Sequence, residues 1–203
     1  EGACAAFGRA DNSCIAIVCR LAVSASSPLS LRPATPADNP AITAIYGPNV
    51  RDGIASFEYD PPDAAEMARR QAAILDAGYP YLVAEIDGSV AGYAYASAYR
   101  SRPGYRFACE NSVYVAPSAQ GKGVGKALLA RLIEDCTTLG YRQMIAVIGN
   151  LGNHGSIALH RACGFTVVGV LPSIGWKLNR WVDCVLMQRP LGEGDKAPPV
   201  DRA

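Results

Sequence analysis

The sequence predicts an α/β fold, in which a mixed sheet carries helices on its faces. Three observations support this prediction. Short apolar runs alternate with amphipathic segments in the order β-α-α-β-β-β-α-β-α-β-β. An Asp-Gly pair at residues 87–88 separates two such runs and indicates a β-hairpin. A glycine-rich turn, "AQGKGVGK", joins a strongly apolar strand to a periodic helix.

The elements of the first half follow from their caps and breakers. "SLRPATPAD" predicts a strand and a turn, where Thr35 or Asp38 caps a helix through Ile42 and Ile45. "PPDAAEMARRQAAILDAG" begins with proline, has an acidic first turn and stops at glycine, so it predicts a second helix. "YLVAEIDGSVAGYAYASAY" predicts the hairpin, and "CENSVYVAP" predicts a strand that Pro117 ends.

The second half continues the alternation. Residues 125–139 are expected to form a helix with one apolar stripe: Leu128, Leu129, Leu132, Ile133 and Cys136. "QMIAVIG" predicts a strand, and residues 156–163 predict a helix that Gly164 ends. "FTVVGVLP" and "WVDCVLMQRPL" predict the last two strands.

One domain is expected over residues 29–191. Residues 1–28 are expected to form an extension outside the core. Their apolar run, residues 15–25, is broken by Arg20 and is shorter than the roughly 20 residues that span a bilayer. A secretory signal is the weaker alternative, because no basic cluster precedes that run. Residues 192–203, "GEGDKAPPVDRA", predict a disordered tail.

Composition limits the partners. Half of the 203 residues are apolar and 18% are charged, as in a soluble globular protein, and the net charge is +1. We therefore expect no nucleic-acid and no membrane partner. The cysteines are scattered without a C-x-x-C pair: Cys4, Cys14, Cys19, Cys109, Cys136, Cys163 and Cys184. With only two histidines, His154 and His160, this predicts no metal site, no disulfide framework and a reducing, cytoplasmic location.

The glycine-rich turn fits neither of two common phosphate loops. Lys126 stands where G-x-x-x-x-G-K-[ST] needs its second glycine, and the G-x-G-x-x-G pattern fails from both Gly121 and Gly123. Glycines before a helix still let backbone N–H groups approach an anion, with Lys122 and Lys126 adding charge. The alternative is an ordinary strand-to-helix turn.

Several ordered motifs together are more specific. After a V-x-V strand comes Q-x-x-G-x-G, with Gln120, Gly123 and Gly125. Residues 153–165 fit N-x-x-S-x-x-L-H-x-x-x-G-F, and "ENSVYV", "GIASFEYDPP" and "GWKLNRWVDCVLMQRPL" add to the pattern. Over about residues 30–190 the chain resembles the GNAT superfamily of N-acetyltransferases, and within it the phosphinothricin and methionine sulfoximine N-acetyltransferase branch.

The resemblance implies a GNAT acyltransferase fold with a mostly antiparallel mixed sheet, and acetyl-CoA as co-substrate. It places the pyrophosphate of coenzyme A on the glycine-rich turn. The residues expected to bind the co-substrate are Val113, Tyr114, Val115, Gln120, Gly121, Lys122, Gly123, Val124, Gly125, Lys126, Asn153 and Ser156.

Two side chains are candidates for proton transfer. Glu110 is an acid in an apolar strand before the turn, where partial burial would raise its pKa, and the resemblance also puts the base in this motif. The alternative is a rim carboxylate paired with Arg102 or Arg106. His160 stands where many members of the superfamily carry a tyrosine, and it is expected to act as acid or second base unless it is structural.

The substrate side rests on fewer residues. Arg100, Arg102 and Arg106 precede Glu110, and their guanidinium groups suit a carboxylate, sulfoximine or phosphinate, unless they form a solvated basic loop. The resemblance implies that Arg100, Arg102 and Tyr105 hold the substrate. The resemblance makes Phe57 part of the pocket wall. Trp176 and Trp181 are expected to belong to the pocket or to a homodimer interface.

The expected function is acetyl transfer from acetyl-CoA to the α-amine of a small amino-acid analogue, by direct attack with general-base help. Phosphinothricin and methionine sulfoximine or sulfone are the leading substrates, which connects the chain with antibiotic or herbicide resistance. One alternative is an acetyltransferase for another amine, such as a protein N-terminus. A second is a non-catalytic acyl-CoA-binding sensor, against which the presence of both Glu110 and His160 counts.

Overall fold

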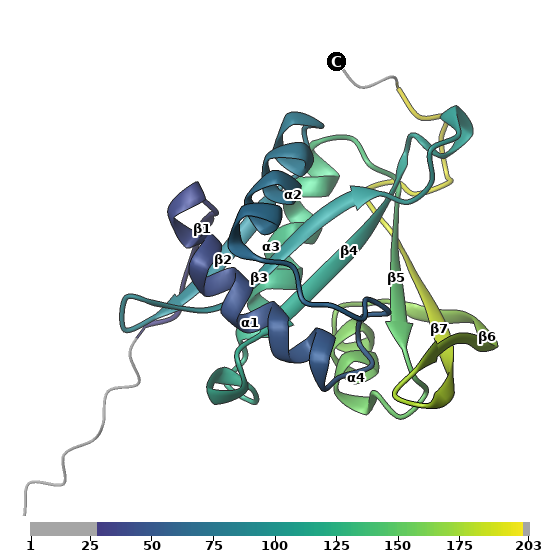
Figure 1. Cartoon of the computed structure of the whole chain (residues 1–203). Coiled ribbons are helices and arrows are strands. Elements are labelled where there is room, and N and C mark those ends of the chain that lie inside the picture. Colours follow the sequence, from purple (N-terminus) through teal and green to yellow (C-terminus); the bar gives the residue numbers. More distant parts are fainter. Residues whose placement is uncertain (1–27, 201–203) are drawn as a thin grey trace, which may run out of the picture.

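The computed structural model describes residues 28–200, which form one seven-stranded sheet with helices on both faces (Figure 1). Its strands are β1 (Ser30–Pro33), β2 (Tyr81–Ile86), β3 (Ser89–Ala98), β4 (Ala108–Val115), β5 (Gln143–Gly149), β6 (Thr166–Lys177) and β7 (Arg180–Pro190). Its α-helices are α1 (Asn39–Arg51), α2 (Ala64–Asp76), α3 (Val124–Thr138) and α4 (His154–Ala162). Three 3₁₀ turns are η1 (Pro36–Asp38), η2 (Pro103–Tyr105) and η3 (Pro117–Ala119). The element order is the predicted one, and the predicted fold class is confirmed.

The strands lie in the order β1-β2-β3-β4-β5-β7-β6. Of the strand pairs in the described residues, β4 and β5 are parallel and the others are antiparallel, as the resemblance implied. Both β6 and the turn after it differ from expectation: β6 runs on to Lys177, and Leu178 and Asn179 form the turn with φ of 50° and 56°. Leucine rarely adopts positive φ, so this turn carries no usual sequence signal.

Two hydrophobic layers hold the helices to the sheet. On one face α3 packs its predicted stripe, all of it buried, against β2, β3 and β4, in a core that β5 and β7 complete. On the other face α1 and Met67 of α2 pack against Val83 and stacked tyrosines of the sheet: Tyr81, Tyr93, Tyr95 and Tyr114. Tyr46 of α1 meets Tyr114 edge-on. Four cysteines of the described residues are buried: Cys109, Cys136, Cys163 and Cys184. Cys4, Cys14 and Cys19 lie outside the described residues.

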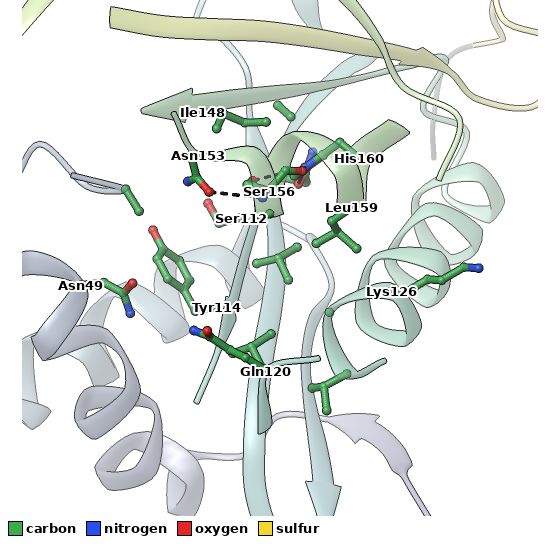
Figure 2. Close-up of a pocket in the computed structure, with 18 of the residues that line it drawn as sticks. Asn49, Ser112, Tyr114, Gln120, Lys126, Ile148, Asn153, Ser156, Leu159 and His160 are labelled. Carbon is green, nitrogen blue, oxygen red and sulfur yellow. Dashed lines mark hydrogen bonds between the residues drawn. The ribbon is translucent and has the colours of Figure 1, made fainter. Parts of the chain in front are cut away.

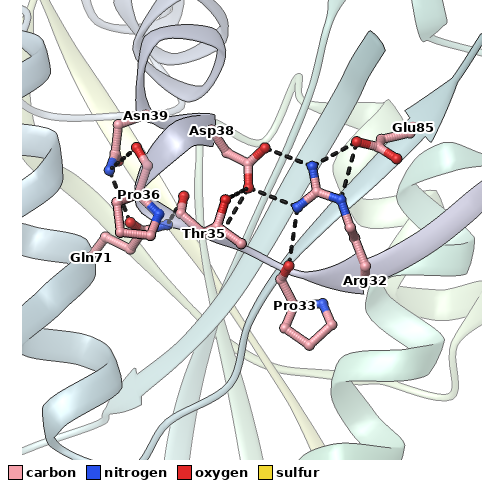
Figure 3. A network of polar contacts seen from close by, with 8 residues as sticks. All are labelled: Arg32, Pro33, Thr35, Pro36, Asp38, Asn39, Gln71 and Glu85. Atoms are coloured by element: carbon pink, nitrogen blue, oxygen red, sulfur yellow. Dashed lines mark hydrogen bonds and ion pairs between the residues drawn. The ribbon is translucent and has the colours of Figure 1, made fainter. Parts of the chain in front are cut away.

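A polar network joins β1, η1 and β2 (Figure 3). Arg32 donates to both carboxylate oxygens of Asp38, at 2.8 and 2.7 Å, and to Glu85 at 2.6 Å. Asp38 also accepts the backbone N–H of Thr35 at 2.7 Å, in a capping box around η1. The predicted side-chain cap of the helix through Ile42 and Ile45 does not form, because the carboxylate of Asp38 is turned to η1 and Arg32 and makes no cap bond to α1. The three elements are thereby fixed in front of α1.

The chain ends bear on two predictions. Residues 192–196 form turns and bends, and Arg142 donates to the carbonyl of Pro198 at 3.2 Å. The disorder expected for residues 192–203 stays a prediction. The predicted extension falls almost wholly outside the described residues. Within residues 28–200, the structure contains no helix with the length and apolarity that crossing a membrane requires.

Candidate active site

The parallel strands β4 and β5 separate in the middle of the sheet. They pair only over residues 108–110 against 143–145, although β4 stays paired with β3 and β5 with β7. Figure 1 shows the two strands parting toward α4. Carboxyl ends of parallel strands are common ligand sites, because a crevice opens there with backbone groups facing it.

A cavity of about 680 Å³ occupies this opening. Its walls come from the separated halves of β4 and β5, the glycine-rich turn, the first turns of α4, and Asn49, Ala55 and Phe57 of α1 and the following loop. Figure 2 shows Ser112 and Tyr114 of β4 facing Asn49 on one side and Asn153, Ser156 and His160 on the other. The cavity therefore passes between β4 and β5 and is lined by helices from both faces of the sheet.

The glycine-rich turn presents backbone donors to the cavity. Gly121 and Gly123 have φ of 74° and 83°, a region that side chains disfavour. No side chain caps α3, and its first helical bond runs from the N–H of Ala127 to the carbonyl of Gly123. The N–H groups of residues 124–126 are thus left for a ligand at the positive end of the helix dipole. This donor set fits a pyrophosphate.

Most residues expected to bind the co-substrate meet in this cavity. Those lining it are Val113, Tyr114, Val115, Gln120, Gly121, Gly123, Val124, Gly125, Lys126, Asn153 and Ser156. Lys122 is exposed and does not line it, and the side chain of Lys126 points away from the other labelled residues in Figure 2. Asn153 caps α4, because its side chain accepts the N–H of Ser156 at 3.2 Å.

Glu110 lies at the last paired position of β4 and lines the cavity. It is half-buried, and burial raises the pKa of its carboxyl above the ordinary value. The sequence predicted both the partial burial and the direction of this shift. A carboxylate held in this way is a stronger proton acceptor than an exposed one.

His160 lines the same cavity but is 4% exposed and bonded on both sides. Its Nδ1 is 2.8 Å from the carbonyl oxygen of Ser156, and its Nε2 is 3.0 Å from Oδ1 of Asn111. Burial lowers the pKa of His160, and the bond to Ser156 opposes that shift. His154, at the start of the same helix, is exposed.

The expected substrate residues are only partly brought together. Phe57 lines the cavity and packs over Gly175 of β6. Arg100, Arg102 and Tyr105 lie exposed on the β3–β4 connection and do not line it. Arg100 instead stacks over the ring of Tyr105 at 5.8 Å.

The wall that carries Phe57 is tied to the β6–β7 hairpin. Lys177 is 2% exposed and donates to the carbonyl of Ser56 at 2.5 Å, and Tyr59 donates to the carbonyl of Trp176 at 2.6 Å. The loop between α1 and α2 is thus anchored to the far edge of the sheet. Within the described residues, no cluster of three or more possible metal ligands occurs.

A comparison with known families now decides the class. Residues 48–165, more than half of the chain, match the family model described as "Acetyltransferase (GNAT) family". The chain belongs to this family. The predicted family and enzyme class are confirmed.

Individual relatives agree with the fold and the branch. The chain is 58% identical to phosphinothricin N-acetyltransferase of Alcaligenes faecalis, over 80% of this chain and 82% of the relative. It is 41% identical to an L-methionine sulfoximine/L-methionine sulfone acetyltransferase of Salmonella typhimurium, over 81% and 96% of the two chains. A crystal structure of a phosphinothricin acetyltransferase from Sinorhizobium meliloti in complex with AcCoA matches with a TM-score of 0.83 and 52% identity, over 85% and 94%.

Sequence analysis missed several residues of the cavity. Asn111 and Ser112 were quoted within "ENSVYV" but given no role, and Asn49 and Ile148 were not considered. One signal was available for Asn111, which lies between Cys109 and Val113 in the alternation of β4. A polar residue among apolar ones on a core-facing side needs a buried partner.

Proposed function

We propose that this enzyme transfers the acetyl group of acetyl-CoA to the α-amine of a small anionic amino-acid analogue. Phosphinothricin, methionine sulfoximine and methionine sulfone are the preferred substrates. The observation that carries the proposal is the β4–β5 opening, where the uncapped amides of α3 and the half-buried Glu110 line one cavity. The names of the relatives support the substrate class.

The residues of the cavity suit coenzyme A. In our proposal the amides of residues 124–126 hold its pyrophosphate, and Asn153 and Ser156 contact the pantetheine arm. Bound acetyl-CoA supplies an activated acetyl group as a thioester. The chain supplies the binding site, its orientation and the proton acceptor.

Glu110 acts on the amine in this proposal. An α-amine is mostly protonated at neutral pH and attacks only after losing its proton. The raised pKa of Glu110 brings this carboxylate closer to the working pH, and it takes the proton directly or through a water. His160 is the second group, and its bonds to Asn111 and Ser156 define its part below.

A release assay tests the proposal. Free thiol from acetyl-CoA is followed with phosphinothricin, methionine sulfone, a peptide with a free N-terminus and a polyamine. We expect release with the first two and little with the polyamine. Preferred acetylation of the peptide supports the alternative amine. If the protein binds acetyl-CoA tightly but no amine causes thiol release, the result supports the non-catalytic acyl-CoA sensor.

A second experiment tests resistance. Expression in a sensitive bacterium should raise the tolerated phosphinothricin concentration if the enzyme acts in the cytoplasm and confers resistance.

We also propose that the enzyme is a homodimer through the β6–β7 hairpin. The edge strand β6 and the start of β7 expose large apolar side chains: Val167, Val168, Val170, Leu171, Ile174, Trp176 and Trp181. Contiguous exposed apolar surface on an edge strand favours association. We expect about twice the chain mass in sedimentation and a monomer for Val168→Asp/Ile174→Asp. Leu75→Asp, which alters an exposed leucine on α2, is the control. A wild-type monomer contradicts the proposal.

A further inference from the structure

One amide side chain connects the two strands of the opening to α4. Asn111 is the first residue of β4 beyond its pairing with β5, and it is 6% exposed. Its Nδ2 donates to the carbonyl of Ile145 at 2.9 Å, across the point where the strands separate. Its Oδ1 is 3.0 Å from Nε2 of His160. Asn111 therefore spans from β5 to α4 through β4.

These contacts require a proton on Nε2 of His160. The carbonyl of Ile145 can only accept, so the amide must turn its NH₂ toward β5 and its oxygen toward the ring. If the amide were turned around, its oxygen would face the carbonyl of Ile145 instead. If Nε2 carried no proton, the oxygen of the Asn111 amide would face another acceptor in either orientation of the amide: Nε2 of His160 in one and the carbonyl of Ile145 in the other.

The other ring nitrogen also faces an acceptor. Nδ1 is 2.8 Å from the carbonyl of Ser156, while the Ser156 hydroxyl is farther away at 3.4 Å. A neutral imidazole carries one N–H, whereas an imidazolium carries two. Only the imidazolium donates to both Asn111 and Ser156.

The remaining surroundings of the ring are uncharged. Phe165 packs edge-on at 5.0 Å between ring centroids. Burial lowers the pKa of His160 and the carbonyl of Ser156 raises it, with no charged residue among the causes in the described structure. The acceptor oxygen of Asn111 acts in the same direction as that of Ser156, and it can be removed by substitution.

We propose that Asn111 is a positioning residue that couples the protonated form of His160 to the separation of β4 and β5. In this arrangement His160 stays in one orientation and, when it is protonated, places its charge at the cavity wall. A positive charge there favours the thiolate of coenzyme A that leaves when the thioester bond breaks, a consequence that rests on the proposed function. The coupling itself is a property of the free protein.

The test uses the two histidines of the chain as NMR probes. His154 is exposed and serves as internal reference, and His154→Gln assigns the two signals. Asn111→Asp keeps an acceptor and adds negative charge, while Asn111→Leu removes the acceptor at similar volume. We expect the pKa of His160 to rise in Asn111→Asp and to fall in Asn111→Leu, with His154 unchanged. An equal pKa of His160 in wild type and both variants overturns the proposal.

Kinetics separates positioning from general damage. Asn111→Leu should lower kcat by roughly 10-fold or more through misplacement of the cavity wall. The pH profile of kcat should move with the pKa of His160, and Asn111→Asp should recover part of the rate. If Asn111→Leu does not fold, Asn111→Asp alone still tests the shift. The pKa of His160 can follow the expected order, highest in Asn111→Asp and lowest in Asn111→Leu, while no amine is acetylated. That result contradicts the proposed function and leaves the coupling intact.

Discussion

Glu110 combines three features that a proton acceptor for an amine needs. It lies at the point where β4 leaves β5, it lines the cavity, and burial raises its pKa. We predict that Glu110→Gln, which keeps the shape and removes the acceptor, lowers kcat by ~100-fold or more. The affinity for acetyl-CoA should barely change. A near-normal rate at pH 7 would mean that another group or solvent takes the proton.

The pH dependence gives a second check on Glu110. A base works only when ionised, so kcat/KM should fall as the pH drops through the raised pKa of this carboxyl. In Glu110→Gln the remaining activity should lose this acidic limb. Initial rates between pH 5 and 9 measure both profiles. An acidic limb that survives in the variant belongs to another residue.

Arg102, like Arg100 and Tyr105, lies exposed outside the cavity, so its role as a substrate residue needs a direct test. If its guanidinium forks onto the substrate carboxylate, Arg102→Lys should weaken catalysis although the charge is kept. Esterifying that carboxylate should weaken catalysis too, and the two losses should not add. The measurement is kcat/KM for wild type and variant, each with free acid and ester. Additive losses would show that Arg102 does not touch the carboxylate.

At the scale of elements, the glycine turn before α3 admits a matched comparison. Gly123 and Gly140 both have φ of 83°, one before α3 at the cavity and the other after its end, outside the cavity lining. Valine strains either position, but only at Gly123 does it crowd the amides that would hold a pyrophosphate. We predict that the KM for acetyl-CoA is much higher in Gly123→Val than in Gly140→Val. Lys122→Ala should raise this KM less than Gly123→Val does. Equal KM values in the two folded glycine variants would refute the assignment.

The sequence predicted the order of elements because caps, glycines and apolar periods act locally. The stripe of α3 and the Asp87-Gly88 hairpin are such cases, and both lie where expected. The β6–β7 turn was missed because Leu178 adopts a positive φ against its own preference, held by the strand pairing on both sides of the turn. The bond from Asn111 to His160 joins residues 49 positions apart, so no local pattern could specify it.

At the scale of the whole molecule, the sheet is covered unevenly. Helices α1 and α2 pack over the β1–β4 side of one face, whereas β6 and the start of β7 expose apolar residues. The loop between α1 and α2 crosses to this side through Phe57 and the bond from Lys177 to Ser56. The cavity wall is therefore continuous with the proposed dimer surface, and a second copy would stiffen it. No local sequence pattern specifies this connection, because it depends on how the layers meet.

Overall stability should depend on pH through the network of Figure 3. Asp38 is 6% exposed, and the hydrogen bonds from Arg32 lower the pKa of its carboxyl from 3.8 to about 2. A depressed folded-state pKa stabilises the protein above the unfolded-state pKa, and this stability is lost as the pH falls through the folded-state value. The shift corresponds to about 2 kcal/mol at neutral pH, which exposure of Arg32 reduces to between about 1 and 2 kcal/mol.

We predict that Asp38→Asn lowers the free energy of unfolding by that amount at pH 7 and by progressively less as the pH approaches 2. Denaturant titrations at several pH values measure the difference between wild type and variant. Glu134→Gln, on the exposed side of α3, is the control and should change stability by less than about 0.5 kcal/mol throughout. The free energies of unfolding of wild type and Asp38→Asn should converge in acid, because the protonated aspartate no longer pairs with Arg32 as a carboxylate. A gap that stays constant down to pH 2 would assign the loss to the cap of η1 and not to the ion pair.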